Sequence, residues 1–124
     1  MLTIREQLES IVKMEINELE EAHKGDGEYH GYGMSKYIED KCLDIHITIQ
    51  KNGKYFGCRL ITSFGGPSVY IDTIREEICA HWGNEKYIYP ILNKDIIKDI
   101  NDYVSEYYNS CIRNKECKSN IEEL

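Results

Sequence analysis

The sequence predicts an α+β fold, in which an antiparallel sheet of about five strands packs against an N-terminal and a C-terminal helix. Residues 4–19 and 96–111 repeat apolar side chains at helical spacing, whereas residues 43–91 alternate apolar and polar side chains in short runs. Because the strand patterns cluster between the helical ones, we expect both helices on one face of the sheet. The 124 residues suit a single domain, 1–124, with a core of its own.

The composition of the chain disfavours several classes of partner. The net charge is −7 and the isoelectric point is near 5.1, which argues against general electrostatic binding to duplex DNA or an anionic membrane. No apolar run is as long as a membrane span, and the N-terminus lacks a signal-peptide pattern. We therefore expect a cytoplasmic protein that neither enters a membrane nor binds duplex DNA directly.

The cysteines indicate neither a disulfide framework nor a metal site. Their number is odd and no two stand in a C-x-x-C pair, so we expect no metal and no cofactor. Two of them fall in strand patterns and are expected to be buried thiols. The five are Cys42, Cys58, Cys79, Cys111 and Cys117.

The first helix has a clear start and stop. Thr3 and Glu6 have the spacing of a capping box, and Gly25 is expected to end the helix. Residues 25–37 are then predicted to be a loop because they contain four glycines. The tyrosines of this loop either close over a planar ligand or pack onto the sheet. The apolar stripe of the helix consists of Ile4, Leu8, Ile11, Val12, Ile16 and Leu19.

The clearest strand signal is a hairpin centred on Asn52 and Gly53, a pair that favours a two-residue type I′ turn. With that turn, Ile49 faces Phe56 on the apolar side of the hairpin. The same register places His46 directly across from Arg59 on the polar side. We expect the polar side, together with the following link 64–67, to form the functional surface.

The later strands are expected at residues 69–72, 78–82 and 87–91. Pro90 predicts that the last of them lies at a sheet edge, because proline cannot donate to a central ladder. Asn93 is expected to cap the second helix. The polar tail 115–124 is expected to fray or to pack on a partner subunit. Surplus aromatic surface at Tyr107 and Tyr108 predicts a homodimer or a higher homo-oligomer.

No catalytic signature stands out in the chain, and we expect a protein that is not an enzyme. There is neither a G-x-S-x-G elbow nor an H-E-x-x-H motif. His46, on the polar side of the hairpin, is best interpreted as a structural group or as a hydrogen-bonding group for a ligand.

Binding of an anionic ligand with a planar base fits the residues better. Arginine forks hold phosphate, an aromatic plane stacks a base, and a Gly-Gly-Pro link exposes backbone N–H groups. Two alternatives stay open, since the tryptophan could pack in the core and the glycines could serve only as a bend. The candidate ligand-binding residues are His46, Arg59, Gly65, Gly66, Trp82, Asn93 and Arg113.

Two successive segments of the chain resemble small bacteriophage proteins. The first runs from Thr62 through Phe64-Gly65-Gly66-Pro67 to a strand at 69–73, and the second is a returning strand that closes on His81-Trp82-Gly83. Among those phage proteins, the length, the α-β-α order and the late Asn and Arg resemble the Thoeris anti-defence proteins of the first described type. The resemblance implies a non-catalytic sponge for a cyclic ADP-ribose isomer in the host cytoplasm. It also implies that Trp82 stacks the adenine, Asn93 touches its edge, and Arg59 and Arg113 hold the phosphates.

A second hypothesis belongs to a different class of function. The acidic faces of the helices are also compatible with a protein-binding inhibitor of a host nuclease complex, of anti-CRISPR or anti-restriction type. A recessed pocket lined by arginines favours the nucleotide sponge, and a convex acidic ridge favours the inhibitor.

Overall fold

A computed structural model describes residues 1–25, 33–114 and 120–124, and it confirms the predicted α+β class. The sheet has six strands in the order β5-β4-β3-β2-β1-β6 and is antiparallel except between β1 and β6, so it has one strand more than predicted. The elements are α1 (Ile4–Lys24), α2 (Met34–Lys41), β1 (Asp44–Ile49), β2 (Tyr55–Ser63), β3 (Ser68–Asp72), β4 (Glu77–Trp82), β5 (Glu85–Pro90), α3 (Lys94–Asn114) and β6 (Asn120–Glu123).

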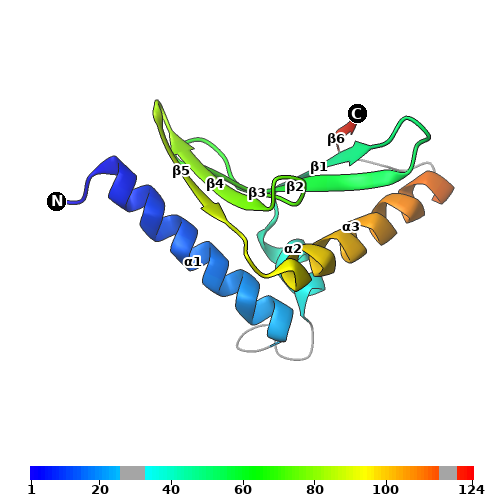
Figure 1. Ribbon diagram of the computed structural model, residues 1–124, viewed down its shortest axis with the longest axis horizontal. Coiled ribbons are helices and arrows are strands. Elements are labelled where there is room, and N and C mark those ends of the chain that lie inside the picture. The colour runs from blue at the N-terminus through cyan, green and yellow to red at the C-terminus, as the bar shows by residue number, and fades with distance from the viewer. Residues whose placement is uncertain (26–32, 115–119) are drawn as a thin grey trace.

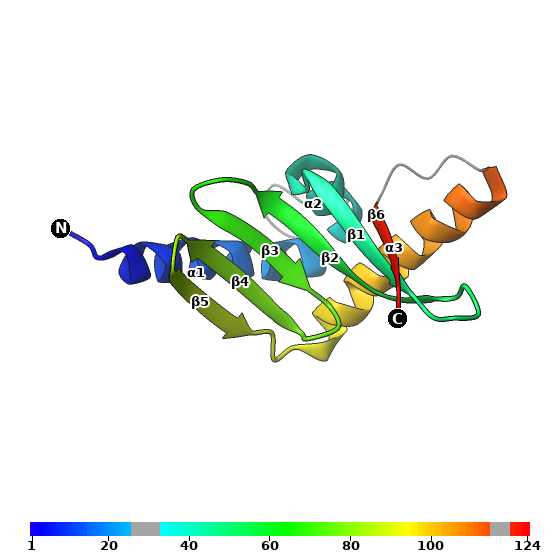
Figure 2. The same ribbon diagram turned by 90° about the horizontal axis from the view of Figure 1, so that it is seen from above.

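The three helices lie on one face of the sheet (Figure 1). The inner side chains of the strands, such as Ile47, Leu60 and Ile78, are fully buried against them. Seen from above, the opposite face of the sheet lies in front of the helices and none of them crosses it (Figure 2). The fold therefore buries the apolar side chains of the sheet on one face and leaves the other face exposed to solvent.

Helix α1 begins and ends as predicted. The Thr3 hydroxyl accepts a hydrogen bond from the Glu6 N–H at 3.1 Å, and the Glu6 carboxylate accepts one from the Thr3 N–H at 3.2 Å. Gly25 ends the helix in the left-handed conformation, with φ of 71°. The buried side of α1 contacts β4 and β5. Ile4, placed in the apolar stripe from its spacing, is exposed because it precedes the first turn that reaches the sheet.

The prediction of a loop through residue 37 is wrong, because residues 34–41 form helix α2. Met34, Tyr37 and Ile38 have the i, i+3, i+4 spacing of one helix face, and all three are buried. The glycines before residue 34 concealed this short pattern. Tyr37 is fully buried and its hydroxyl donates a hydrogen bond to the Glu15 carboxylate of α1. The other tyrosines of the predicted loop, at 29 and 32, lie outside the described residues.

The hairpin of β1 and β2 has the predicted register from Ile45 to Thr48, including His46 opposite Arg59. The prediction is wrong at Ile49, which pairs with Tyr55 because a bulge shifts the register after Thr48. The type I′ turn is also wrong. The Gly53 N–H donates to the Gln50 carbonyl at 2.8 Å, and only Gly53 in this turn has a positive φ, of 85°. The turn is therefore one residue longer, with glycine at the bulge position.

The distal part of the sheet agrees with the predicted pattern. β5 is an edge strand and ends at Pro90, which pairs with Glu77 on β4 and has no strand on its other side. The Asn93 Oδ1 atom accepts a hydrogen bond from the Asp95 N–H at 3.0 Å, so Asn93 caps α3 as expected.

One expectation about the C-terminal part is wrong, and another loses part of its support. The tail does not simply fray, since residues 120–123 form β6, which pairs with β1 in parallel. Without β6 the backbone of β1 would form an open edge, and that free edge explains the pairing. Tyr108 is buried and its hydroxyl donates to the Gly53 carbonyl at 2.8 Å. Of the two tyrosines from which an oligomer was predicted, Tyr108 is thus covered within the chain and Tyr107 is partly buried, and the oligomer stays a prediction.

The hairpin turn leads to a first prediction. Replacing Gly53 with valine should lower the free energy of unfolding by more than about 1 kcal/mol, because a β-branched residue is strained at positive φ. A Cβ at this position would meet no other atom within 4 Å, so the loss would come from the backbone alone. Urea denaturation measures it. Gly53→Asn is the matched control, since asparagine tolerates this conformation and should lose less. Equal losses in both variants would contradict the prediction.

Glu15 leads to a second prediction. Its burial between α1 and α2 raises the pKa of the carboxyl above its ordinary value, against the lowering effect of the Tyr37 hydrogen bond. The folded state thus binds the Glu15 proton more tightly than the unfolded state. The free energy of unfolding therefore falls as the pH rises from the pKa of Glu15 in the unfolded chain through its pKa in the folded protein. Glu15→Gln keeps an acceptor for Tyr37 and removes the charge.

The Glu15→Gln variant should therefore be more stable than the wild type at pH 7, with a smaller difference at pH 4. Chemical denaturation at both pH values measures this. Glu21→Gln, on the exposed side of the same helix, controls for the change in net charge. A gain that is the same at both pH values, or equal in the control, would rule out the buried carboxyl as its cause.

Candidate functional site

The candidate site is the side of the sheet that faces away from the helices, which we call the open face. The strand registers set its side chains in rows that run across the sheet. One row joins His46, Arg59 and Asp72 on β1, β2 and β3. Another joins Ser68, His81 and Lys86 on β3, β4 and β5. Tyr70 lies between these two rows, because it alternates with Ser68 and Asp72 along β3.

Arg59 occupies the middle of the open face. Its Nη2 atom lies 3.4 Å from Asp72 Oδ2, and its guanidinium carbon lies 4.3 Å from the centre of the Tyr70 ring. Burial, the largest cause, raises the pKa of Tyr70 to about 12, so the ring stays neutral beneath the cation. The Arg59 side chain is still 42% exposed. Because one carboxylate contact at this distance occupies few of its five donors, the guanidinium has N–H groups left for an anion.

Asp72 holds Arg59 in this position. Its side chain is 7% exposed, and its Oδ1 atom accepts hydrogen bonds from the N–H groups of Ile74 and Arg75 at 2.9 and 3.0 Å. These bonds fix the turn between β3 and β4. Oδ2 remains for the guanidinium, so the same carboxylate fixes both the turn and the direction of Arg59.

On one side of Arg59 lies a hollow of about 400 Å³, which we call the basic hollow. His81 and Lys86 face each other across β4 and β5 and join Arg59 in its wall. Neither His81 nor Lys86 forms an ion pair with another described residue. Three basic side chains thus share the wall of this hollow with the Tyr70 ring and with one carboxylate, that of Glu85. The hollow is lined by Arg59, Tyr70, His81, Gly83, Asn84, Glu85 and Lys86.

On the other side of Arg59 lies a smaller hollow of about 120 Å³. His46 Nε2 is 3.2 Å from Asp44 Oδ2, and the Asn120 amide nitrogen is 3.1 Å from both atoms. This polar cluster joins β1 to β6. The small hollow is lined by His46, Thr48, Cys58, Arg59, Asp72, Ile74 and Glu122, so Arg59 belongs to both hollows.

The structure separates the predicted ligand-binding residues into groups. His46 and Arg59 share the open face, as the hairpin register predicts. Trp82 is 44% exposed, so it is not a core residue. Its indole lies against Gly66, where an added Cβ would be 3.0 Å from Nε1. Gly65, the residue before Gly66, has a φ of 90°. Trp82 and the two glycines thus form one corner at the end of the sheet, outside the lining of the basic hollow.

Asn93 and Arg113 are not brought to the open face by any described contact. The Asn93 side chain caps α3 and lines a different hollow, together with Tyr89 and Ile96. Position 113 belongs to the last turn of α3, but the side chain of Arg113 lies outside what the structure describes.

Three residues of the basic hollow, Tyr70, His81 and Lys86, were not among the predicted ligand-binding residues. The alternation of β3 and β4 does place Tyr70 and His81 on the polar side of their strands. What it does not show is which of them lies beside Arg59. That neighbour depends on the register between β2 and β3, which shifts between Ile61 and Ser63.

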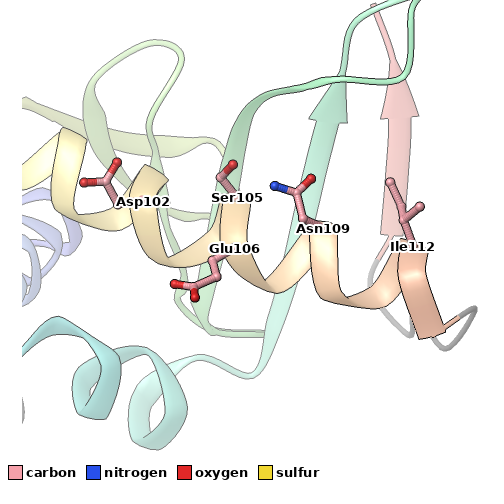
Figure 3. A pocket seen from close by; sticks show the side chains of 5 residues that line it. All are labelled: Asp102, Ser105, Glu106, Asn109 and Ile112. Atoms are coloured by element: carbon pink, nitrogen blue, oxygen red, sulfur yellow. The ribbon is translucent and has the colours of Figure 1, made fainter.

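A third hollow, of about 500 Å³, runs along α3 (Figure 3). Its lining residues all come from that one helix, and Asp102 and Glu106 make it acidic. A ligand there would touch a single element, and the only basic group beside the described lining residues is Lys98, whose Nζ atom lies 2.6 Å from Asp102 Oδ2. The basic hollow combines four strands and the β4–β5 turn, which makes it the stronger candidate for a ligand site. The lining of the hollow on α3 is Asp102, Ser105, Glu106, Asn109 and Ile112.

Thiol and metal chemistry gain no support from the described residues. Burial raises the pKa of Cys58 to about 11 and that of Cys42 to about 12, so both stay protonated thiols near neutral pH. In residues 1–25, 33–114 and 120–124, no group of three or more His, Cys, Asp or Glu side chains is placed to hold a metal ion. Across the same ranges, no helix combines the length and the apolar character needed to span a membrane.

Comparisons with known proteins identify no relative. No family model matches the sequence, and neither the curated proteins nor the solved structures include a match to this chain. The open face itself is therefore the feature of this chain that bears on its function.

The contacts of Asp72 lead to a third prediction. Asp72→Asn keeps an oxygen for the Ile74 and Arg75 N–H groups but loses the charge that holds Arg59, and it should cost about 1.5 to 3 kcal/mol, the range for a hydrogen bond to a charged group. Asp72→Ala loses the turn contacts as well and should cost more. Urea denaturation at pH 7 measures both. Equal stability of the asparagine variant and the wild type would show that the contact with Arg59 contributes nothing to folding.

Proposed function

We propose that the chain binds a small anionic ligand with a planar ring, of the nucleotide class, in the basic hollow and holds it without chemical change. The observation that carries the proposal is the grouping of Arg59, His81 and Lys86 around Tyr70 on a face that the helices leave open. Phosphate oxygens suit the three basic side chains, and a planar base suits the edge or face of the tyrosine ring.

The size of the hollow supports this ligand class. Its volume of about 400 Å³ falls within the range of roughly 300 to 1,000 Å³ that small-molecule sites occupy. Gly83 and Asn84 of the β4–β5 turn complete its lining. The positive charge is local, since the chain as a whole carries −7. A local basic group on an acidic protein favours a small ligand over a long polyanion.

In the setting that the resemblance to the Thoeris anti-defence proteins implies, the ligand is a cyclic ADP-ribose isomer and the role is sequestration of a host immune signal. Arg59 keeps its proposed phosphate contact in this arrangement. Tyr70 takes the place proposed for Trp82 as the ring nearest to Arg59, because the indole lies in the corner beside Gly66.

The inhibitor of a host nuclease complex remains the second candidate, and the exposed carboxylates on α3 are the feature that supports it. Asp102 and Glu106 lie on its surface, and Asp99, one turn earlier, pairs with His23 at 3.1 Å. A protein partner with a basic surface would meet these carboxylates. Variants of the basic hollow would not change that interaction, so the two functions are separable.

A fourth prediction tests the proposed function. Isothermal titration calorimetry with cyclic ADP-ribose and ADP-ribose should detect binding, and Lys86→Gln should weaken it about tenfold, the equivalent of about 1.4 kcal/mol. Lys86 is exposed and makes no described ion pair, so the fold should be unaffected. Lys51→Gln, at the exposed tip of the β1–β2 hairpin, changes the net charge equally and should bind like the wild type.

The ligand released by heating the complex should be chemically intact by mass spectrometry. Recovery of a hydrolysed product would exclude sequestration without chemistry. Absence of binding to any nucleotide, or equal weakening by Lys86→Gln and Lys51→Gln, would exclude the basic hollow as the site.

A further inference from the structure

The C-terminal strand places an acidic side chain on the open face. β6 runs parallel to β1, with Asn120 opposite His46 and Glu122 opposite Thr48. Because side chains in register share a face, Glu122 lies on the same side of the sheet as His46 and Arg59. Figure 2 shows β6 beside β1 at the rim of this face. Glu123, the next residue, pairs with Ile49 and belongs to the opposite face.

Glu122 borders the small hollow together with Arg59, His46 and Thr48. It forms no ion pair with another described residue, and its side chain is exposed. The guanidinium of Arg59 therefore has Tyr70 and the basic hollow on one side, and a free carboxylate across the small hollow on the other. An anion that approaches Arg59 meets the negative charge of Glu122 as well.

The strand that carries Glu122 is held by few contacts. All four residues of β6 are exposed. Apart from the ladder with β1, its hydrogen bonds to other described residues are those of the Asn120 amide with Asp44 and His46, at 3.1 Å each, and the one from the Leu124 N–H to the Ile49 carbonyl at 2.9 Å. These contacts position the strand, but none of them brings a positive charge to the Glu122 carboxylate.

We propose that Glu122 sets the charge selectivity of the open face, by opposing ligands in proportion to the negative charge that they place near Arg59. This inference rests on the proposed function, since it concerns the same Arg59. The repulsion between two charges scales with their product, so each added phosphate charge on the ligand increases the penalty from one fixed carboxylate. Glu122 thereby favours ligands of low charge over polyphosphates, an effect opposite to that of Lys86.

The experiment measures the dissociation constants of adenosine, AMP, ADP and ATP by calorimetry, at about 50 mM salt, where the Debye length exceeds 10 Å. The proteins are the wild type, Glu122→Gln and Glu123→Gln. The last variant removes the same charge from the same strand on the opposite face, and so it controls for net charge.

Glu122→Gln should bind ADP about threefold more tightly than the wild type does. The gain over the wild type should be larger for ATP, and the affinity for adenosine should not change. Such a gain is of the size expected for one half-solvated pair of like charges. Glu123→Gln should change each affinity less than twofold. Amide hydrogen exchange at Leu124 should be the same in all three proteins, which shows that β6 stays paired with β1.

Equal gains in the two variants would overturn the inference, because net charge would then explain them. Weaker binding by Glu122→Gln would overturn it by making the carboxylate a ligand contact, and loss of protection at Leu124 would assign the gain to release of the strand. If the wild type binds nucleotides and the variants match it, only this inference fails. If none of the three proteins binds any of the four probes, the proposed function fails together with it.

Discussion

The buried carboxylate of Asp72 is the group on which the open face depends. It accepts hydrogen bonds from two backbone N–H groups in the β3–β4 turn and meets the Arg59 guanidinium with its second oxygen. A carboxylate with so little exposure would be costly without such partners. The three contacts satisfy it, and in doing so they hold a cation against the Tyr70 ring in the middle of the sheet.

The asymmetry of the sheet makes this arrangement available for binding. The three helices cover one face and bury the inner side chains, so the stability of the domain comes mainly from that side. The outer side chains are then free to be polar and charged. Short turns between β3, β4 and β5 keep Tyr70, His81 and Lys86 on adjacent strands, which places the basic hollow on rigid elements rather than on long loops.

Charged side chains lie on both sides of Arg59. Lys86 lines the hollow on one side together with His81 and Glu85, and Glu122 lines the hollow on the other side together with Asp72. The candidate site therefore consists of several charged side chains and not of Arg59 alone. The C-terminal strand thus contributes a charged side chain to the open face, although its sequence showed no strand pattern.

Local signals in the sequence were sufficient for the α+β class, the ends of α1, the cap of α3 at Asn93, the edge position of Pro90 and the pairing of His46 with Arg59. Each of these depends on residues close together in the chain, or on one short turn. Helix α2 was missed because its pattern spans only two turns after a glycine-rich stretch. The type I′ turn was wrong because a bulge, which no local pattern revealed, lengthens the hairpin by one residue.

The sequence by itself determined which residues of each strand face away from the core, because alternation with a period of two follows directly from strand geometry. Only the tertiary structure decided which of those residues meet. Tyr70 and Lys86 join Arg59 through the pairing of four strands, of which the β2–β3 pair shifts its register at a bulge, and Glu122 reaches the same face through a parallel pairing between the second half of the chain and the first. Such contacts depend on the packing of distant segments, and the spacing of residues along one segment does not encode them.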